Sequence, residues 1–376
     1  MQERGARPVL VAAGGTGGHL FPAEALAAAL ARCGVPVQLA TDTRAARYGD
    51  AFPAAAVHVV PSATVRGRDP ISLARTAGLL GYGTWAAWRL LGRLNPAIVV
   101  GFGGYPSVPP VLAATFRGIP TLIHEQNGVV GRANRLLAPR VTAIATGFPG
   151  VVDADGRLAI KATYTGNPIR PAVVAVSQIP YPATSGTRPL RLLIFGGSQG
   201  ARVMSEIVPA AVAQLPPDLR QRLHITQQAR AEDLAVVRNT YAGLQVANEV
   251  APFFADLPAR MAASHLIISR SGASTVAELA AIGRPAILVP LPHALDQDQL
   301  ANASMLERAG GAIRFHQSEF TPARLAAEIS ALAGAPSRLA AMAEGAKSMA
   351  AVDAADRLAS LVLRVANLTL RDTGPT

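Results

Sequence analysis

A glycine-rich turn followed by a histidine carries the first sign of chemistry in the chain. Residues 9–30, VLVAAGGTGGHLFPAEALAAAL, read as an apolar strand, a turn with four glycines in five residues, and a helix entered through Pro22. Glycines before a helix let backbone N–H groups approach an anion, and the helix dipole favours negative charge there. An imidazole suits general-base chemistry near neutral pH. The stretch predicts that His19 meets a reacting hydroxyl or a phosphate oxygen; the alternative is a histidine that caps or packs against the helix.

Three further turns of this kind follow: GFGGYPS at 101–107, GGSQG at 196–200 and SRSGAS at 269–274. The dinucleotide pattern G-x-G-x-x-G is not met, because a count from Gly15 and Gly17 ends at Leu20. The Walker pattern is absent as well, since no lysine follows any of the turns. Four such turns at strand ends, two in each half of the chain, indicate two phosphorylated ligands.

The turns lie in a pattern of apolar runs that alternate with helical segments, which is typical of βαβ units and parallel sheets. RLLIFGGSQGARVMSEIV, which begins at Arg191, repeats the opening order of strand, glycine turn and helix, so we predict two doubly wound α/β domains. We place an N-terminal domain at 1–168, a Pro-rich linker at 169–189, a second domain at 190–350, and a C-terminal helix and tail at 351–376 that could pack back on the first domain. The other predicted strands are 8–13, 36–41, 57–61, 97–102, 121–125, 141–146, 223–226, 265–269, 286–290 and 312–315.

Composition and charge restrict the class of protein. The formal net charge is +11, and residues 1–165 carry 16 basic against 8 acidic side chains, a net of +8. An excess of positive charge in one half of the chain indicates nucleic acid, anionic lipid or phosphorylated substrates as partners, unless the excess only reflects an arginine-rich composition. The single cysteine, Cys33, excludes an internal disulfide and a cysteine-based zinc site. With no secretion-signal pattern at the start, we expect a cytoplasmic chain.

Six segments in order resemble the MurG family, bacterial transferases that move N-acetylglucosamine (GlcNAc) from UDP-GlcNAc to undecaprenyl-pyrophosphoryl-MurNAc-pentapeptide, called lipid I. The segments are GGTGGHLFPAEALA, GFGGYPSVPPVLAA, IHEQNGVVGRANR, GNPIRPAV, FGGSQGAR and SRSGASTVAELAAIGRPAILVPLPHALDQDQLANA, within residues 13–303. The resemblance implies a GT-B fold, in which two Rossmann-like domains face each other across a cleft. The acceptor domain comes first and the sugar-nucleotide domain second.

The resemblance also implies a set of donor-binding residues. Ser274 or Thr275 can begin a helix whose N-terminus faces the diphosphate, and Glu278 can accept both ribose hydroxyls. Gln299 is the expected contact to GlcNAc. Gln297 is the alternative, because the spacing after His293 is one residue longer here than in some relatives. The full donor set is Thr16, Gly17, Gly18, Asn127, Arg170, Ser198, Phe254 (through its backbone), Ala273, Ser274, Thr275, Glu278, Gln297, Gln299 and Asn302.

The implied reaction is a displacement at the anomeric carbon of GlcNAc by the 4-hydroxyl of MurNAc, with UDP leaving and inversion from α to β. Such a step needs a base near the hydroxyl and stabilisation of the diphosphate charge. We predict His19 as the base, with Glu125 as its rival, and a structural role for His124. The acceptor residues are predicted to be Gly14, Gly15, Gly103, Gly104 and Tyr105.

We expect no cofactor and no obligate metal. Two D-x-D strings occur, at 153–155 and 296–298, and such pairs of carboxylates can chelate a divalent metal ion. The first reads as a turn and the second as the start of a helix, where aspartate is a good cap. The resemblance implies helix dipoles and basic side chains in place of a metal.

Residues 66–94 contain both tryptophans of the chain, Trp85 and Trp88, among leucines and arginines. The longest uncharged run there has 13 residues, well short of the roughly 20 needed to span a bilayer. Aromatic residues beside Arg75 and Arg89 are typical of a helix that lies on anionic lipid, although an amphipathic core helix with solvated arginines would look similar. MurG relatives have a hydrophobic patch with basic neighbours here, which favours peripheral binding to the cytoplasmic face of the inner membrane.

The sequence therefore predicts an inverting glycosyltransferase of peptidoglycan synthesis, whose partners are UDP-GlcNAc, lipid I, an anionic membrane and other cell-wall synthesis proteins. Two alternatives stay open. A UDP-GlcNAc 2-epimerase would share the fold but would have no use for the loops at 101–107 and 124–128. A nucleotide sensor or a basic nucleic-acid protein would explain the charge but not the paired domains, and basic–aromatic interleaving on strands is missing, so we predict no nucleic acid.

Overall fold

The computed structural model describes residues 7–14, 17–43, 52–62, 70–152, 156–182, 188–197, 200–292, 294 and 296–368. The chain divides into two compact units. Met1–Arg170 and Asp353–Thr376 form the first unit, and Pro171–Val352 forms the second. Each unit has its own parallel sheet, in agreement with the two doubly wound domains expected from the sequence.

The first unit is built on a seven-stranded parallel sheet with the order β3-β2-β1-β4-β5-β6-β7. Its central strands are fully buried and apolar, as parallel strands covered on both faces must be. The strands are β1 (Val9–Ala12), β2 (Val37–Thr41), β3 (Ala56–Val59), β4 (Ile98–Gly101), β5 (Thr121–Glu125), β6 (Ala143–Thr146) and β7 (Ala162–Tyr164).

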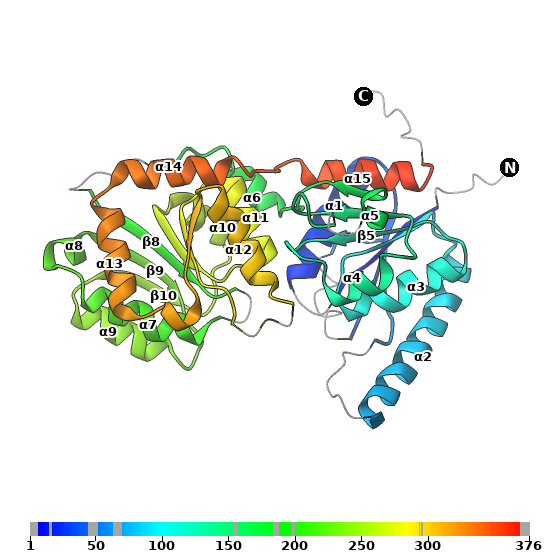
Figure 1. Ribbon diagram of the computed structural model, residues 1–376, viewed down its shortest axis with the longest axis horizontal. Helices are drawn as coiled ribbons and strands as arrows, with labels where there is room; N and C mark the ends of the chain where they lie inside the picture. The colour runs from blue at the N-terminus through cyan, green and yellow to red at the C-terminus, as the bar shows by residue number, and fades with distance from the viewer. Residues whose placement is uncertain are drawn as a thin grey trace. The chain divides into compact units, whose positions relative to one another are not determined.

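Helices cover both faces of this sheet. Val9 and Val11 belong to a core cluster with α1 and α15, whereas Leu10 and Ala12 belong to one with α2 and α3, as the alternation of a strand requires. Helix α15, at the end of the chain, packs beside α1, as Figure 1 shows in red and blue. The elements are α1 (Gly17–Arg32), α2 (Pro70–Leu94), η2 (Tyr105–Ser107), α3 (Val108–Phe116), α4 (Arg132–Leu137), α5 (Gly156–Ala159) and α15 (Ala354–Val365).

The second unit has a six-stranded parallel sheet with the order β10-β9-β8-β11-β12-β13. The strands are β8 (Leu190–Phe195), β9 (Leu223–Gln228), β10 (Ala247–Ala251), β11 (Leu266–Ser269), β12 (Ala286–Leu288) and β13 (Ala312–Arg314). The helices are α6 (Pro171–Val176), α7 (Arg202–Ala213), α8 (Pro217–Arg222), α9 (Leu234–Gly243), α10 (Leu257–Ala263), α11 (Ala273–Ile282), α12 (Asp298–Arg308), η3 (Gln317–Glu319), α13 (Pro322–Ala333) and α14 (Pro336–Lys347).

Each sheet has one point at which the strand order reverses, between β1 and β4 in the first unit and between β8 and β11 in the second. Loops that leave the carboxyl ends of the two strands diverge there, which opens a crevice for a ligand. The four glycine turns noted in the sequence follow these four strands: β1, β4, β8 and β11. The fold therefore gathers the turns in two pairs, one pair in each unit.

Three features differ from the sequence-based expectation. Strands β7 and β10 were not predicted; both are edge strands, and three of the five residues of β10, ANEVA, are exposed. Within the predicted linker the structure has a helix, α6, which packs on α10 and α11 of the second unit. The helix after β11 begins at Ala273 with Gly272 as its N-cap, one or two residues before the predicted start at Ser274 or Thr275.

Candidate active site

His19 is the third residue of α1 and lies against the turn that follows β4. Its Nδ1 atom is 2.9 Å from the backbone oxygen of Phe102 and 2.8 Å from the side-chain amide of Gln126. A carbonyl oxygen can only accept, so Nδ1 carries the proton and donates it to Phe102. The Gln126 atom at 2.8 Å is Nε2, which can only donate, so this tautomer requires the Gln126 amide to be turned over with its oxygen toward Nδ1. In this tautomer Nε2 is the basic atom of the neutral ring.

Two glycines after β4 leave room for the imidazole. Gly103 and Gly104 have φ values of +81° and +68°, a region that L side chains rarely adopt. A Cβ atom at Gly104 would lie 3.2 Å from Nε2 of His19, and one at Gly103 would lie 3.5 Å from its Cε1. The half-buried Tyr105 follows directly, at the start of η2. The structure thus brings four predicted residues together at the point where the strand order reverses.

The turn after β1 is only partly described, because the predicted donor residue Thr16 and acceptor residue Gly15 lie outside the described residues. Gly17 and Gly18 form the beginning of α1. Gly14 passes close to the η2 turn: a Cβ atom there would lie 3.0 Å from Cβ of Pro106. A side chain at position 14 would therefore push the two turns apart.

Glu125, the predicted rival base, is 2% exposed at the end of β5. Its Oε1 accepts from the backbone N–H and the side chain of Asn127 at 3.0 and 3.2 Å. Its Oε2 accepts from Gly131 N–H at 2.9 Å and from the Asn134 amide at 2.8 Å. Burial raises the pKa of Glu125, while these hydrogen bonds act in the opposite direction. Both oxygens are engaged in fixing the loop after β5, which favours a positioning role over that of a base.

The histidine beside it is a structural group. His124 is fully buried, and its Nε2 donates to the backbone oxygen of Gly166 at 3.2 Å. Desolvation lowers the pKa of His124 to about 4, so the ring is neutral at pH 7. Asn167 adds a second link, because its amide donates to the backbone oxygen of Gln126 at 2.8 Å. The segment GNPIR is thereby tied to the loop that holds His19.

Arg170, predicted to reach the donor diphosphate, is the last residue of the first unit. Its guanidinium lies 4.9 Å from the ring centroid of Phe21 in α1. It also faces Glu24 closely enough to oppose the rise that burial causes in the pKa of that carboxyl group. The structure thus places this cation beside the first turns of α1, the helix that carries His19.

In the second unit, the turn after β11 ends in the N-terminus of α11. Because the first intrahelical bond runs from Val276 N–H to Gly272, the N–H groups of residues 273–275 have no partner inside the helix. Such N–H groups are able to bind an anion, and the buried Glu278 lies one turn farther along the same helix. The Ser271 hydroxyl donates to the backbone oxygen of Gln299 at 2.8 Å, which joins this turn to α12.

The residues predicted to contact GlcNAc lie at the start of α12. Gln299 is half-buried and accepts from Leu291 N–H through Oε1 at 3.0 Å. Gln297 is exposed, is the N-cap of α12 and has a φ of +53°. Asn302 is fully buried, and its amide donates to the backbone oxygen of Ser271 at 3.2 Å. This geometry favours Asn302 as a support for the Ser271 turn rather than as a sugar contact.

A pocket of 470 Å³ lies beside the glycine turn that follows β8. Gly196 N–H donates to Gln228 at 3.2 Å, and the aliphatic part of Arg230 packs against Gly200. Ser198, the donor residue predicted in this turn, lies outside the described residues. The pocket is lined by Gly200, Gln228, Ala229, Arg230, Ala231, Glu232 and Pro252. Phe254 follows soon after Pro252; its ring is buried under the Arg260 guanidinium at 4.3 Å, in keeping with a contact through its backbone.

Of the two Asp pairs considered as metal ligands, residues 153–155 lie outside the described residues. Asp298 is the first residue of α12 and accepts from Gln299 N–H at 2.8 Å, so it serves the start of the helix. Within the described part of the chain, no three His, Cys, Asp or Glu side chains gather closely enough to hold a metal ion.

Helix α2 exposes aromatic side chains on one side and packs on α3 with the other. Trp85 and Trp88 are 51% and 45% exposed. The Arg89 guanidinium lies 5.1 Å from the Trp85 ring, and that of Arg117 lies 3.9 Å from the Trp88 ring. Further exposed apolar side chains are Leu79 and Tyr82 of α2 and Phe116 of α3. Thus the tryptophans are not core residues. None of the helices in the described ranges is long and apolar enough to cross a membrane.

Comparison with known proteins decides the family. Residues 9–146 match the N-terminal domain of glycosyltransferase family 28, and residues 191–358 match its C-terminal domain. A protein of Rhodopseudomonas palustris strain BisB18 is 60% identical over 361 residues, 96% of each chain. It is named UDP-N-acetylglucosamine–N-acetylmuramyl-(pentapeptide) pyrophosphoryl-undecaprenol N-acetylglucosamine transferase. The crystal structure of Acinetobacter baumannii MurG superposes with a TM-score of 0.78 at 30% identity and covers 95% of this chain and 99% of its own.

The chain belongs to the MurG family of glycosyltransferases. The GT-B fold expected from the sequence is confirmed, since the MurG crystal structure matches over nearly its whole length. A UDP-GlcNAc 2-epimerase of Neisseria meningitidis, bound to UDP-GlcNAc, also matches with a TM-score of 0.64, covering 95% of this chain and 100% of its own. At 15% identity that likeness shows the fold alone.

Three residues of the candidate site were not singled out from the sequence. Gln126, Asn134 and Asn167 are buried amides that connect His19, Glu125 and the GNPIR segment. The available signal was the concentration of amide side chains in IHEQNGVVGRANR, around the end of β5, and in GNPIR, after β7. Buried amides in such loops usually fix the backbone around a site.

Proposed function

We propose that this chain transfers GlcNAc from UDP-GlcNAc to the 4-hydroxyl of MurNAc in undecaprenyl-pyrophosphoryl-MurNAc-pentapeptide, with inversion at the anomeric carbon. The relatives' names support the substrates. The structural observation that carries the proposal is the orientation of His19, whose Nδ1–H is committed to Phe102 and whose Nε2 lies over Gly104. A neutral imidazole fixed in that tautomer is suited to take a proton from a hydroxyl group.

In the proposed reaction the hydroxyl oxygen of MurNAc forms a bond to the anomeric carbon of GlcNAc, and its proton passes to Nε2 of His19. The bond from that carbon to the diphosphate oxygen breaks, and its electron pair leaves with UDP. The acceptor sugar would lie beside Gly14, Gly103, Gly104 and Tyr105 in the first unit. Glu125 acts indirectly: it holds the loop that presents Gln126 to Nδ1.

The donor would be held by the second unit. The leaving diphosphate gains negative charge, and the unpaired N–H groups of residues 273–275 at the start of α11 would stabilise it without reorganisation. The buried Ser274 hydroxyl has no partner among the described residues, so it is available for the same group. Glu278 would accept the ribose hydroxyls, and Gln299 would meet the GlcNAc ring. Arg170 would add a cation from the end of the first unit.

We further propose that α2 docks on the cytoplasmic face of the inner membrane, where the lipid-linked acceptor is anchored. Exposed Trp85 and Trp88, each stacked with an arginine, offer apolar contact area together with positive charge. This combination favours the interface of an anionic bilayer. Other proteins of cell-wall synthesis would be met at the same surface.

The test is transfer of labelled GlcNAc from UDP-GlcNAc to a short-chain analogue of lipid I, with EDTA present. We expect a β-1,4-linked product, and we expect His19→Ala to lower kcat by about 10²-fold or more, as loss of a general base does, with affinity for UDP-GlcNAc unchanged. Product that requires added Mg²⁺ would instead indicate an Asp pair as a metal site. Binding of UDP-GlcNAc without transfer in either condition would refute the proposal and favour the epimerase or sensor alternatives.

A further inference from the structure

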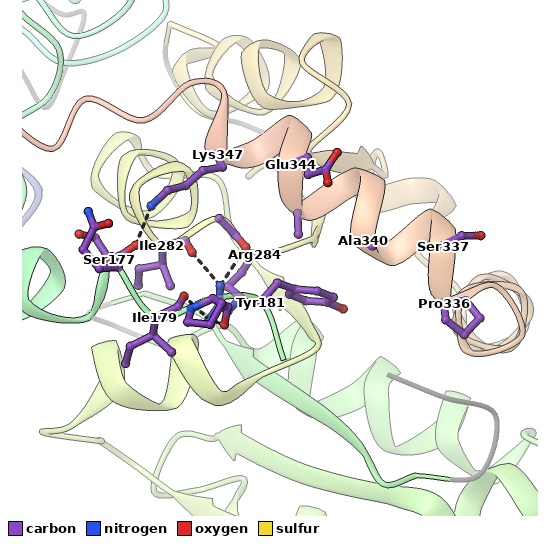
Figure 2. Close-up of a pocket in the computed structure, with 14 residues that line it drawn as sticks. Ser177, Ile179, Tyr181, Ile282, Arg284, Pro336, Ser337, Ala340, Glu344 and Lys347 are labelled. Carbon is purple, nitrogen blue, oxygen red and sulfur yellow. Dashed lines mark hydrogen bonds between the residues drawn. The ribbon is translucent and has the colours of Figure 1, made fainter. Parts of the chain in front are cut away.

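A second cavity, of 640 Å³, lies in the second unit and is separate from the candidate donor site. One wall is the face of α14, and the other is the segment 177–181 together with the turn between α11 and β12 (Figure 2). That turn precedes β12, so the cavity adjoins the amino ends of the strands, whereas the donor turns follow their carboxyl ends. Its volume is within the range of small-molecule sites.

Arg284 forms the floor of this cavity and is 1% exposed. Its guanidinium donates only to backbone oxygens: those of Ala262, Ile282, Gly283, Ile179 and Pro180, at 2.6 to 3.2 Å. No carboxylate of the described residues pairs with it. The carbonyl dipoles satisfy its donors but leave a full positive charge inside the protein, which is costly without a counterion.

Lys347, the last residue of α14, adds a second cation without a paired carboxylate in the described part of the chain. Its Nζ atom donates to the backbone oxygens of Ser177 and Ala281, each at 2.6 Å. An ammonium group has three N–H donors, so one is left for a ligand. Figure 2 shows this side chain reaching toward Ser177, while the carboxylate of Glu344 lies farther along α14, away from Arg284.

The remaining lining is largely apolar and partly uncovered. Ile179 is 47% exposed, and the ring of Tyr181 faces the cavity. The Arg284 guanidinium lies 5.7 Å from the centroid of that ring. Opposite them, Ala340 and Ala343 leave the face of α14 without bulky side chains. A flat or branched apolar body therefore fits between Tyr181 and α14, with its anionic group toward Lys347.

We propose that this cavity binds a small organic anion with an apolar body, through an anionic contact to Lys347 and packing against Tyr181 and α14. The positive charge of two cations without paired carboxylates selects the anion, and the apolar walls select its body. Such a ligand would join segment 177–181 to α14, and these two segments adjoin the points where the chain crosses between the units, Arg170–Pro171 and Val352–Asp353.

The cavity is also connected to the candidate donor site through one helix. Helix α11 has its N-terminus at the predicted diphosphate site and its last residue, Ile282, in the cavity wall. An occupant that shifts Ile282 and Gly283 would move α11 along its axis and so change affinity for the donor. This coupling rests on the proposed function, whereas binding to the cavity does not.

The probe is 8-anilinonaphthalene-1-sulfonate, an aromatic sulfonate, compared with N-phenyl-1-naphthylamine, which has the same rings without the charge. The chain has two lysines, and Lys161 donates to two backbone oxygens in the same way as Lys347 does but lies in the first unit. In the full-length protein, the sulfonate should protect Lys347 and not Lys161 from acylation, as read by mass spectrometry. Equal protection of both, or of neither, would overturn the proposal.

Variants make the assignment specific. Lys347→Met should weaken protein-bound fluorescence of the sulfonate about tenfold in Kd, the loss of one charge-assisted hydrogen bond, whereas Lys161→Met should not. Glu344→Gln should tighten binding, because it removes a negative charge from the rim of the cavity, and Ala340→Trp should abolish binding by filling the space. If Lys347→Met does not fold, Ala340→Trp still tests whether the probe binds in this cavity. Unchanged affinity in the folded Ala340→Trp protein, or equal affinity for the neutral probe, would refute the site; an effect on donor binding is measured separately with UDP.

Discussion

Gly104→Ala is the sharpest test of where the proton transfer occurs. The added Cβ atom would lie 3.2 Å from Nε2 and 3.3 Å from Cδ2 of His19, closer than ordinary van der Waals contact. The ring cannot retreat freely, because Nδ1 is held 2.9 Å from the backbone oxygen of Phe102. The methyl group would therefore displace the imidazole by a few tenths of an ångström and cover part of the basic nitrogen.

The magnitude can be separated from backbone strain with a matched variant. Gly104 has a φ of +68°, and Gly34, beyond the end of α1, has a φ of +69° with nothing within 4 Å of its would-be Cβ. Each alanine substitution should cost about 1–2 kcal/mol of stability, because an L side chain crowds the next carbonyl in this region. Only Gly104→Ala touches the imidazole, and a misplacement of up to about 1 Å costs as much as 10²-fold in rate, so we expect kcat to fall by roughly tenfold or more.

The assay compares both variants with the unchanged protein. Free energies of unfolding come from urea titrations, and kcat comes from GlcNAc transfer with both substrates saturating. Affinity for UDP-GlcNAc should be the same in all three proteins. If Gly104→Ala and Gly34→Ala retain the same kcat, Nε2 of His19 does not face the reacting hydroxyl, and the proposed base is wrong.

The remaining predictions concern Glu125, α2 and His124. Glu125→Gln should lower stability by about 1–3 kcal/mol, because Gly131 N–H loses its acceptor, and should leave the shape of the pH–rate profile unchanged; a lost limb of that profile would make Glu125 the base. Changing Trp85 and Trp88 together to serine should abolish binding to anionic vesicles and spare transfer to a short-chain soluble acceptor, and equal loss of both would contradict lipid docking. The pKa of His124 falls from 6.5 to about 4 on folding, so stability present at pH 7 should decline by about 3 kcal/mol as the pH falls from 6.5 to 4. His124→Gln should remove that decline in urea titrations, and an unchanged slope would refute it.

Much of the fold could be read from the sequence because its central strands are buried on both faces. Such strands appear as uninterrupted apolar runs, IVVG in β4 and LLIF in β8 being examples. Two of the four edge strands, β7 and β10, were not predicted; β10 exposes the polar side chains of ANEVA and has no alternation to detect. Helix α6 was not predicted for another reason. It has only six residues, begins with a proline and lies in a segment whose composition indicates a linker.

The candidate site could be predicted only where the backbone conformation requires a particular residue type. Glycine turns can be recognised in the sequence, because few residue types other than glycine adopt a positive φ. The histidine beside one of these turns is recognised with it. The hydrogen-bond network that orients His19 cannot be recognised in the sequence, since its bonds join residues that are 41, 83 and 107 positions apart. Nothing in the sequence near His19 shows that Phe102 will offer a carbonyl oxygen to Nδ1. That contact depends on the strand order, which places β1 beside β4.

The residues proposed for the acceptor in the first unit and for the donor in the second unit are held by different means. Nδ1 of His19 contacts a backbone carbonyl and the neutral amide of Gln126, and the carboxylate of Glu125 is engaged by its own loop. At α11 the contacts are backbone N–H groups at the positive end of a helix, which suits a group that gains negative charge as it leaves. Under the proposed roles, His19 takes the proton beside a neutral amide and a helix dipole stabilises the leaving group, so exchanging that amide for a charge, as in Gln126→Glu, should lower kcat more than the volume change predicts.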